Sequence, residues 1–197
     1  MADFASRVIA LNRAAWSLRR AGPRPCTLPF ALALFSDAQR LPPLEELVEQ
    51  LPRDTDPVAI VFRHDHLPED QRLAVAGRVC EAVQARGHLF IMARASLSGA
   101  DGHHAVPVGS GIRTTPVHNE EEIAAATLAG ADAMFLSPVN GTASHPAQPP
   151  LGRSRAVALA QAARLPVFAL GGMHEATAAV LEGTPFQGFG AIDAFRV

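Results

Sequence analysis

The sequence has 197 residues, of which 48% are hydrophobic, and a formal net charge of −2 at pH 7. This length suits one domain with a full core, no apolar run reaches the roughly 18 residues of a membrane span, and the charge argues against a basic face for nucleic acid. All 17 basic residues are arginines, which excludes Schiff-base catalysis, a pyridoxal-phosphate anchor and a Walker A loop, because each needs a lysine.

The start of the chain lacks the basic-then-apolar order of a secretion signal, and the two cysteines, Cys26 and Cys80, are too few for a disulfide framework. Both observations predict a cytoplasmic protein. The charge pattern predicts a small-molecule partner, with no nucleic acid and no membrane. The sequence leaves open whether two copies form a homodimer.

Apolar residues at helical spacing predict an N-terminal helix over residues 2–21, outside any repeat. A Pro-rich connector follows over residues 22–29. From residue 30 onward, strand and helix signals alternate to the end of the chain. We therefore predict one domain over residues 1–197, with its repeating part over residues 30–197.

Eight short apolar segments predict strands, at Phe30–Ser36, Val58–Arg63, Leu89–Ala93, His103–Val106, Ile112–Val117, Ala133–Ser137, Val167–Leu170 and Gly188–Ile192. Five segments between them predict helices, at Leu44–Leu51, Glu69–Arg86, Glu120–Leu128, Ser154–Ala163 and Glu175–Leu181.

The segments after strands 3 and 4 are too short for helices, and the chain ends soon after strand 8. This alternation predicts an α/β fold, a single (β/α)8 TIM barrel with an extra N-terminal helix and shortened or missing outer helices after strands 3, 4 and 8. A doubly wound open sheet is the alternative, but it more often has about five or six strands.

The stretch from Gly130 to Met173 contains two apolar strands, each followed by a loop rich in Gly, Pro, Ser and Thr. Barrels of this kind bind ligands at the carboxyl ends of their strands. In the second loop, Gly171 and Gly172 can offer bare backbone N–H groups to an anion. The alternative is a tight turn, because glycine is the usual residue where the backbone needs a positive φ.

Several motifs follow one another along the chain. They are GADG (Gly99–Gly102) with a histidine shortly after, VHNEEE (Val117–Glu122), GADA (Gly130–Ala133), SPVNGTASHPAQPPLG (Ser137–Gly152) and LPVFALGGM (Leu165–Met173). Their order resembles the thiamine phosphate synthase and TenI family. The resemblance runs from about the second strand to the end of the chain.

The resemblance implies a compact (β/α)8 barrel of thiamine biosynthesis. The synthase joins a pyrimidine pyrophosphate to a thiazole phosphate with Mg²⁺, and the tautomerase branch isomerises the thiazole phosphate with a histidine. By resemblance, the catalytic histidine is His118. The residues that bind substrate or phosphate are, in the same way, Arg63, Thr142, Ser144, His145, Gly171 and Gly172, where His145 replaces a lysine of the family.

Other positions depart from the family's pattern. A lysine that follows the strand-end arginine is replaced within His64-Asp65-His66, and the Asn-Asp pair whose aspartate binds magnesium aligns with Ala93-Arg94. The second magnesium aspartate has no counterpart in residues 107–111, and Asp193 replaces a small hydroxyl residue. These changes remove the charge compensation that a departing pyrophosphate needs. Mg²⁺ is therefore expected only if synthase activity is retained.

Seven of the eight histidines lie near predicted strand carboxyl ends or their loops, either as scattered surface residues or as the lining of a barrel mouth. His118 can shuttle a proton between carbon and nitrogen of a bound heterocycle, since imidazole titrates near neutrality, or it can simply precede the next helix. His64, His66 and His104 offer a metal site in the barrel mouth, but no carboxylate completes a recognised spacing, so we assign no metal ligand.

Three functions follow from this comparison. The first is a synthase-like barrel that binds a thiazole phosphate or a related phosphorylated precursor. The second is a metal-independent, tautomerase-like isomerase that uses His118, and the third is a non-catalytic barrel that binds a phosphorylated ligand. The sequence thus leaves open whether the protein is a transferase, an isomerase or no enzyme at all.

Overall fold

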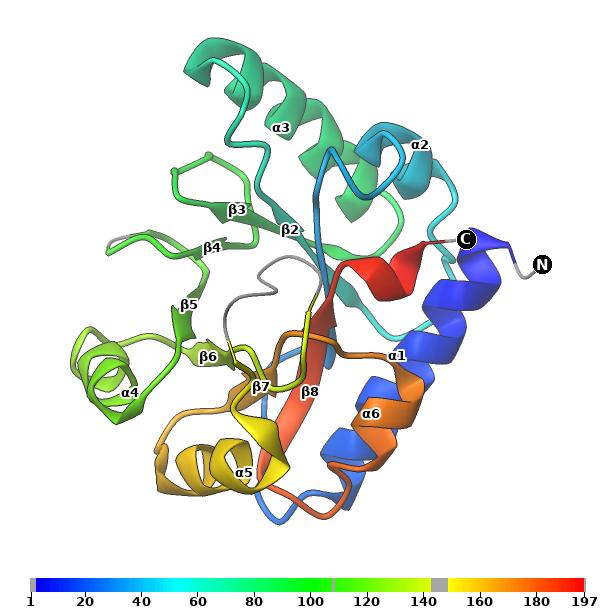
Figure 1. The fold of residues 1–197 in the computed structure, drawn as a ribbon. Coiled ribbons are helices and arrows are strands. Elements are labelled where there is room, and N and C mark those ends of the chain that lie inside the picture. The colour runs from blue at the N-terminus through cyan, green and yellow to red at the C-terminus, as the bar shows by residue number, and fades with distance from the viewer. Residues whose placement is uncertain (1–2, 108, 143–148, 197) are drawn as a thin grey trace.

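The computed structural model describes residues 3–107, 109–142 and 149–196. Their strands form one closed parallel barrel in chain order, in which β8 pairs with β1 (Figure 1). The strands are β1 (Leu32–Phe35), β2 (Val58–Phe62), β3 (Leu89–Ala93), β4 (Gly102–His104), β5 (Ile112–Val117), β6 (Ala133–Leu136), β7 (Val167–Ala169) and β8 (Phe186–Ala191). Each of the eight predicted strands is present, which confirms the (β/α)8 barrel.

The strands are apolar along their length because both of their faces are buried, one inside the barrel and one under the helices. Inside the barrel, Phe35 and Phe168 each pack against Phe135, with ring centroids 5.0 and 5.3 Å apart. The alternate residues of the same strands, such as Leu34, belong to the larger cluster between strands and helices. The barrel is therefore a filled core, and a ligand can enter only at its ends.

The outer layer contains the predicted helices with ends that differ by a few residues. These are α1 (Phe4–Ala21), α2 (Leu44–Glu49), α3 (Glu69–Gln84), α4 (Glu120–Leu128), α5 (Gly152–Ala162) and α6 (Glu175–Ala179), and β8 is followed by a 3-10 turn, η1 (Asp193–Phe195). Within the described residues, no helix follows β3 or β4. None of the helices in the described part of the chain is long and apolar enough to cross a membrane.

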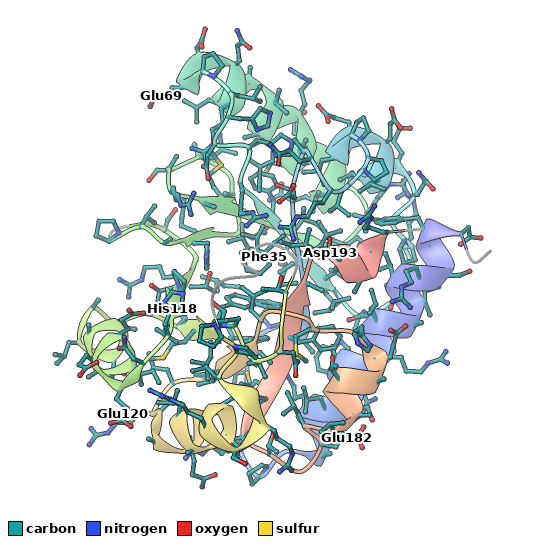
Figure 2. All side chains as sticks on the ribbon, in the orientation of Figure 1. Phe35, Glu69, His118, Glu120, Glu182 and Asp193 are labelled. Atoms are coloured by element: carbon teal, nitrogen blue, oxygen red, sulfur yellow. The ribbon has the colours of Figure 1, made fainter. Side chains whose placement is uncertain are left out.

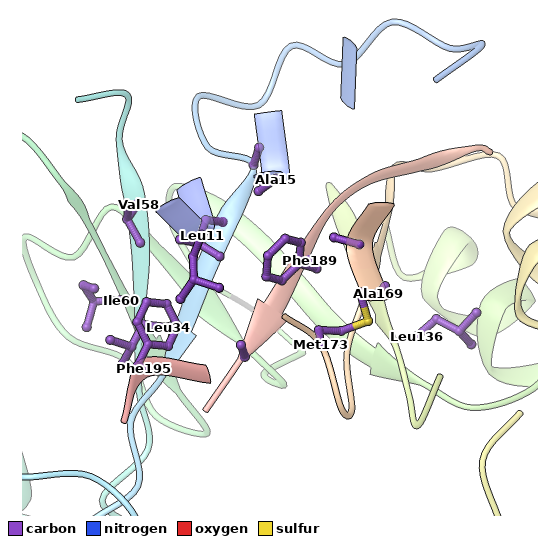
Figure 3. Packing of buried hydrophobic residues seen from close by; sticks show 14 of the residues in the cluster. Leu11, Ala15, Leu34, Val58, Ile60, Leu136, Ala169, Met173, Phe189 and Phe195 are labelled. Atoms are coloured by element: carbon purple, nitrogen blue, oxygen red, sulfur yellow. The ribbon is translucent and has the colours of Figure 1, made fainter. Parts of the chain in front are cut away.

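The N-terminal helix α1 lies outside the repeat in sequence but belongs to the outer layer in space. It packs against β8, β1 and α6 (Figure 1), where the helix after β8 would otherwise lie. Figure 3 shows Leu11 and Ala15 of α1 beside Phe189 of β8, and all three side chains are fully buried. The helix begins at Asp3, whose carboxylate accepts a hydrogen bond from the Ser6 N–H. Thus α1 covers the outer side of the barrel beside β8 and β1.

Arg19 of α1 closes the amino-terminal end of the barrel. Its guanidinium donates to the backbone carbonyls of Gln187 (2.8 Å), Leu28 (2.7 Å) and Phe30. It also lies over the Trp16 ring, 4.7 Å from the centroid. A ligand site is therefore expected at the opposite, carboxyl-terminal end.

Candidate active site

A cavity of about 200 Å³ opens at the carboxyl-terminal end of the barrel. Loops that follow β1, β2, β5, β6, β7 and β8 contribute to it. Its lining residues are Phe35, Arg40, Arg63, His118, Ser137, Pro138, Thr142, Leu170, Gly171, Gly172, Met173, Ala191, Ile192, Asp193 and Ala194. Figure 2 shows Phe35 and Asp193 over the barrel centre and His118 toward α4. We call this cavity the mouth pocket.

The mouth pocket brings together five of the seven predicted site residues, namely Arg63, His118, Thr142, Gly171 and Gly172. They come from four different loops, so their meeting is a property of the closed barrel. The other two, Ser144 and His145, lie outside the described residues.

The Gly171-Gly172 loop needs two glycines. Their φ angles are +93° and +60°, in the region that side chains disfavour. A Cβ on Gly171 would lie 2.9 Å from the Pro138 Cα, and one on Gly172 would lie 2.5 Å from the Gly141 carbonyl oxygen. The Asn140 N–H donates to the Gly171 carbonyl at 3.1 Å, which ties the loop to the one after β6.

The N–H groups of Gly171 and Gly172 donate to no partner among the described residues. Next along the chain, the His174 N–H donates to the Thr177 hydroxyl at 2.9 Å, and this hydroxyl also lies 3.2 Å from the Gly172 carbonyl oxygen. The loop is therefore fixed through its carbonyls, while its N–H groups remain available. A pair of free backbone N–H groups is a suitable contact for an anion.

Arg63 extends from the end of β2 and is fixed by the loop after β1. Its Nε donates to the Ser36 carbonyl at 2.8 Å and its Nη2 to Asp37 Oδ2 at 3.1 Å. Burial lowers the pKa of the Arg63 guanidinium, and the negative charge of Asp37 opposes this effect. Arg63 is thus a cation in a fixed position, and Asp37 already compensates part of its charge.

Asp37 has a second partner, Arg40, whose Nε and Nη2 lie 3.0 and 2.7 Å from Asp37 Oδ2. Partial burial by itself raises the pKa of Asp37, but the hydrogen bonds and charges of the arginines offset this, so the pKa is lowered. The remaining Arg40 Nη1 lies 3.3 Å from Asp193 Oδ2. Sequence reasoning missed Asp37 and Arg40, because nothing in their spacing indicates that they meet Arg63.

His118 follows β5 and is oriented by Glu122, four residues later on the first turn of α4. Its Nδ1 lies 2.8 Å from Glu122 Oε2, and its backbone N–H donates to the same oxygen at 2.9 Å. Partial burial tends to raise the pKa of Glu122, but the hydrogen bonds from His118 and Asn119 lower it overall. This arrangement leaves His118 Nε2 as the nitrogen that can exchange protons. Sequence reasoning included Glu122 in the VHNEEE motif without giving it a role in the site, although its i+4 spacing from His118 was a usable signal.

His104, at the end of β4, lies in the barrel core beside the pocket-lining Phe35, at 5.3 Å between ring centroids. Its Nδ1 is 2.9 Å from the Thr114 hydroxyl. Burial, with smaller contributions from the positive charges of Arg94 and Arg63, lowers the pKa of His104 to about 3. His104 is therefore neutral at physiological pH.

The hypothesis of a metal bound by His64, His66 and His104 is not supported. The rings of His64 and His66 lie 5.5 Å apart at a second cavity between the loops after β1 and β2, whereas His104 is in the barrel core. Burial, followed by the charge of His66, lowers the pKa of His64. In the described part of the chain, no three His, Cys, Asp or Glu side chains are placed to hold a metal ion.

Fold and site together define a (β/α)8 barrel with a pocket at the carboxyl ends of its strands, where barrels of this kind bind their ligands. The TMP-TENI family model, described as thiamine monophosphate synthase, matches residues 108–195. This range includes His118, Thr142, Gly171 and Gly172. The chain is therefore similar to this family over slightly less than half of its length.

A solved structure of thiamine phosphate pyrophosphorylase from Pyrococcus furiosus has the same fold, with a TM-score of 0.67 and 20% sequence identity over 82% of this chain and 84% of that one. A FabK mutant from Thermotoga maritima matches with a TM-score of 0.43 and 14% identity over 77% and 48% of the two chains. Nitroalkane oxidase from Streptomyces ansochromogenes matches with a TM-score of 0.34 and 17% sequence identity over 77% of this chain and 36% of that one. No curated protein sequence matches the chain.

Proposed function

We propose that the mouth pocket binds a thiazole phosphate or a related phosphorylated heterocycle of thiamine biosynthesis. The observation that carries this proposal is the fixed Gly171-Gly172 loop, which lines the same pocket as Arg63 and His118 and whose N–H groups have no acceptor among the described residues. The phosphate would accept hydrogen bonds from the two glycines, as anions do from bare backbone N–H groups.

The apolar part of the pocket suits the heterocycle. Phe35, Leu170, Met173 and Ile192 line the pocket together with the glycine loop and the two arginines. An aromatic ring placed against them would lose contact with water while its phosphate stayed at the glycine loop. Such a ligand would bring its ring toward His118.

The described residues do not fit the Mg²⁺ ion that the family's synthase uses. The position of the first magnesium aspartate is Arg94, a cation that pairs with Asp65. Asp37, the nearest carboxylate to Arg63, is itself paired with two arginines. We therefore derive no synthase step through a metal, and this misfit favours functions that need no pyrophosphate departure.

A tautomerase-like isomerisation is the enzymatic function that the site supports best. His118 Nε2 would take a proton from a ring carbon, and the resulting imidazolium would return a proton to the conjugated ring atom. Glu122 would fix the ring orientation and stabilise the imidazolium by its negative charge, since it lies 2.8 Å from Nδ1. The specific observation in favour of this function is the pair formed by His118 Nδ1 and Glu122 Oε2.

Calorimetry with inorganic phosphate and with thiazole phosphate tests the binding proposal, and the absence of binding by either ligand would contradict it. Exchange of solvent deuterium into the bound thiazole phosphate tests the isomerase. We expect exchange in the wild-type protein and its loss in His118→Ala with ligand binding retained. Binding without exchange in the wild type would instead identify a non-catalytic barrel.

A synthase assay distinguishes a thiamine phosphate synthase from the isomerase and from the non-catalytic barrel. The protein at high concentration is given both family substrates and Mg²⁺, and release of pyrophosphate is measured. We expect no release, because the carboxylates and lysines that would compensate the leaving group are replaced. Turnover above the background rate would restore the synthase assignment.

A further inference from the structure

Asp193 places a carboxylate on the wall of the pocket that we propose for a phosphate. It is the first residue of η1, two residues after the end of β8, and its side chain is 41% exposed. It lines the same cavity as Gly171 and Gly172. A carboxylate close to a phosphate disfavours binding unless another group compensates one of the two charges.

Arg40 compensates Asp193 only in part. The distance from Arg40 Nη1 to Asp193 Oδ2 is 3.3 Å, longer than the usual 2.7–2.9 Å of a charge-assisted hydrogen bond. The same guanidinium makes two shorter contacts with Asp37, at 3.0 and 2.7 Å. Of these two carboxylates, Asp37 thus makes the shorter contacts with Arg40. Asp193 Oδ1 accepts no hydrogen bond from the described residues.

Among the described residues, the two arginines and two aspartates on the β1, β2 and β8 side of the pocket balance one another in charge. Arg40 and Arg63 supply two positive charges, and Asp37 and Asp193 supply two negative ones. A ligand with one phosphate can use the uncharged N–H groups of the glycine loop. A second anionic group would meet arginines that already have carboxylate partners, whereas a cationic group would meet the open side of Asp193.

From this layout we infer that the pocket selects a zwitterionic ligand with one phosphate and one cationic nitrogen, the nitrogen facing Asp193. The inference rests on the proposed phosphate site and adds the second recognition element to it. A charged nitrogen next to Asp193 forms an ion pair and also removes the repulsion between Asp193 and the phosphate. The substrate class is thus a phosphorylated, protonated or quaternary nitrogen compound.

Matched pairs of small phosphates test this inference. Dissociation constants are measured by calorimetry for 2-aminoethyl phosphate against ethyl phosphate, and for 3-aminopropyl phosphate against propyl phosphate. The two lengths allow for the span between the glycine loop and Asp193. We expect the better aminoalkyl phosphate to bind the wild-type protein roughly three- to tenfold more tightly than its matched alkyl phosphate.

Asp193→Asn should abolish this preference. It should also strengthen binding of the alkyl phosphates, because it removes a negative charge from the pocket wall and leaves the charge of Arg40 less compensated. Asp54→Asn makes the same charge change in the loop before β2, at the opposite end of the barrel, and should leave the preference intact. Equal binding of matched phosphates by the wild type would overturn the inference and leave the phosphate site standing. Failure of all four phosphates and of inorganic phosphate to bind would overturn both.

Discussion

Gly172 combines two constraints that a side chain cannot meet, a φ of +60° and a Cβ position 2.5 Å from the Gly141 carbonyl oxygen. Gly172→Ala should therefore displace the loop and weaken binding of inorganic phosphate by about tenfold or more, with a loss of about 1–3 kcal/mol in unfolding free energy. Calorimetry and chemical denaturation measure the two effects.

Gly141→Ala is the matched control, because a Cβ at Gly141 meets no atom within 4 Å. This variant should bind phosphate as the wild type does. If Gly172→Ala also bound phosphate normally, the anion site would not be at this loop.

Glu122 fixes the orientation of the His118 ring through its contact with Nδ1. Glu122→Gln keeps the shape but removes the negative charge 2.8 Å from His118 Nδ1. We expect the rate of deuterium exchange into thiazole phosphate to fall by roughly tenfold or more, with the dissociation constant nearly unchanged. Glu121→Gln, on the same helical turn, should leave the rate unchanged. An unaltered rate in Glu122→Gln would show that His118 acts without this partner.

Sequence alone indicated the site residues that follow strand ends, and Arg63, His118, Thr142 and the two glycines do meet in one pocket. It could not indicate the groups that hold them. Asp37 and Arg40 meet Arg63 only because the loop after β1 turns toward β2. No periodicity encodes such a turn, so partner residues on irregular loops are visible only in three dimensions.

At the scale of elements, α1 links two loops of the mouth through one side chain. The Arg7 Nε donates to the Ala194 carbonyl in η1 at 2.6 Å, and its Nη1 pairs with Glu175 at the start of α6. The glycine loop precedes α6, and Asp193 begins η1. Arg7 therefore fixes the two segments between which the ligand would lie.

Arg7→Ala should weaken phosphate binding by roughly three- to tenfold, because the glycine loop loses support on its α6 side. The measurement is calorimetry at a temperature well below the unfolding midpoint, where a stability loss alone leaves the affinity unchanged. Arg13→Ala, an exposed arginine on the same helix, is the control and should bind normally. Equal affinities for the two variants would limit Arg7 to a structural role.

The helical spacing of Phe4, Val8, Leu11, Ala15 and Leu18 predicted α1 and its buried face. The same spacing does not say what covers that face, since any apolar surface would satisfy it. Only closure of the barrel reveals that α1 takes the place of the helix missing after β8.

For the whole molecule, the number and order of strands was enough to predict a closed barrel. Eight apolar strands cannot all be buried in a small open sheet without helices on both faces, and this chain has too few helices for that. The charge states and ion pairs of the side chains at the barrel's mouth were less predictable from sequence, because they depend on burial and on which residues meet. His104 is the clearest case, a histidine that appeared available for chemistry and is enclosed by Phe35 and Phe135.

The buried, neutral state of His104 makes the stability of the whole barrel depend on pH. Its pKa is lowered by burial from 6.5 to about 3 in the folded protein. Between these values the unfolded chain binds a proton that the folded protein does not, so acid favours unfolding. The contribution of His104 to stability is complete above pH 6.5 and is lost as the pH falls toward 3, by up to about 1.4 kcal/mol per pH unit.

Chemical denaturation at several pH values measures this dependence. His104→Phe, which substitutes an aromatic ring among aromatic neighbours, should flatten the decrease in unfolding free energy between pH 6.5 and 4 relative to the wild type. Carboxylates contribute to acid unfolding in both proteins, so the difference between the two slopes isolates His104. His66→Gln, at an exposed histidine, should retain the wild-type slope. Parallel slopes for wild type and His104→Phe would mean that His104 accepts a proton in the folded barrel, and the core around Phe35 would then have to admit water or a counter-charge.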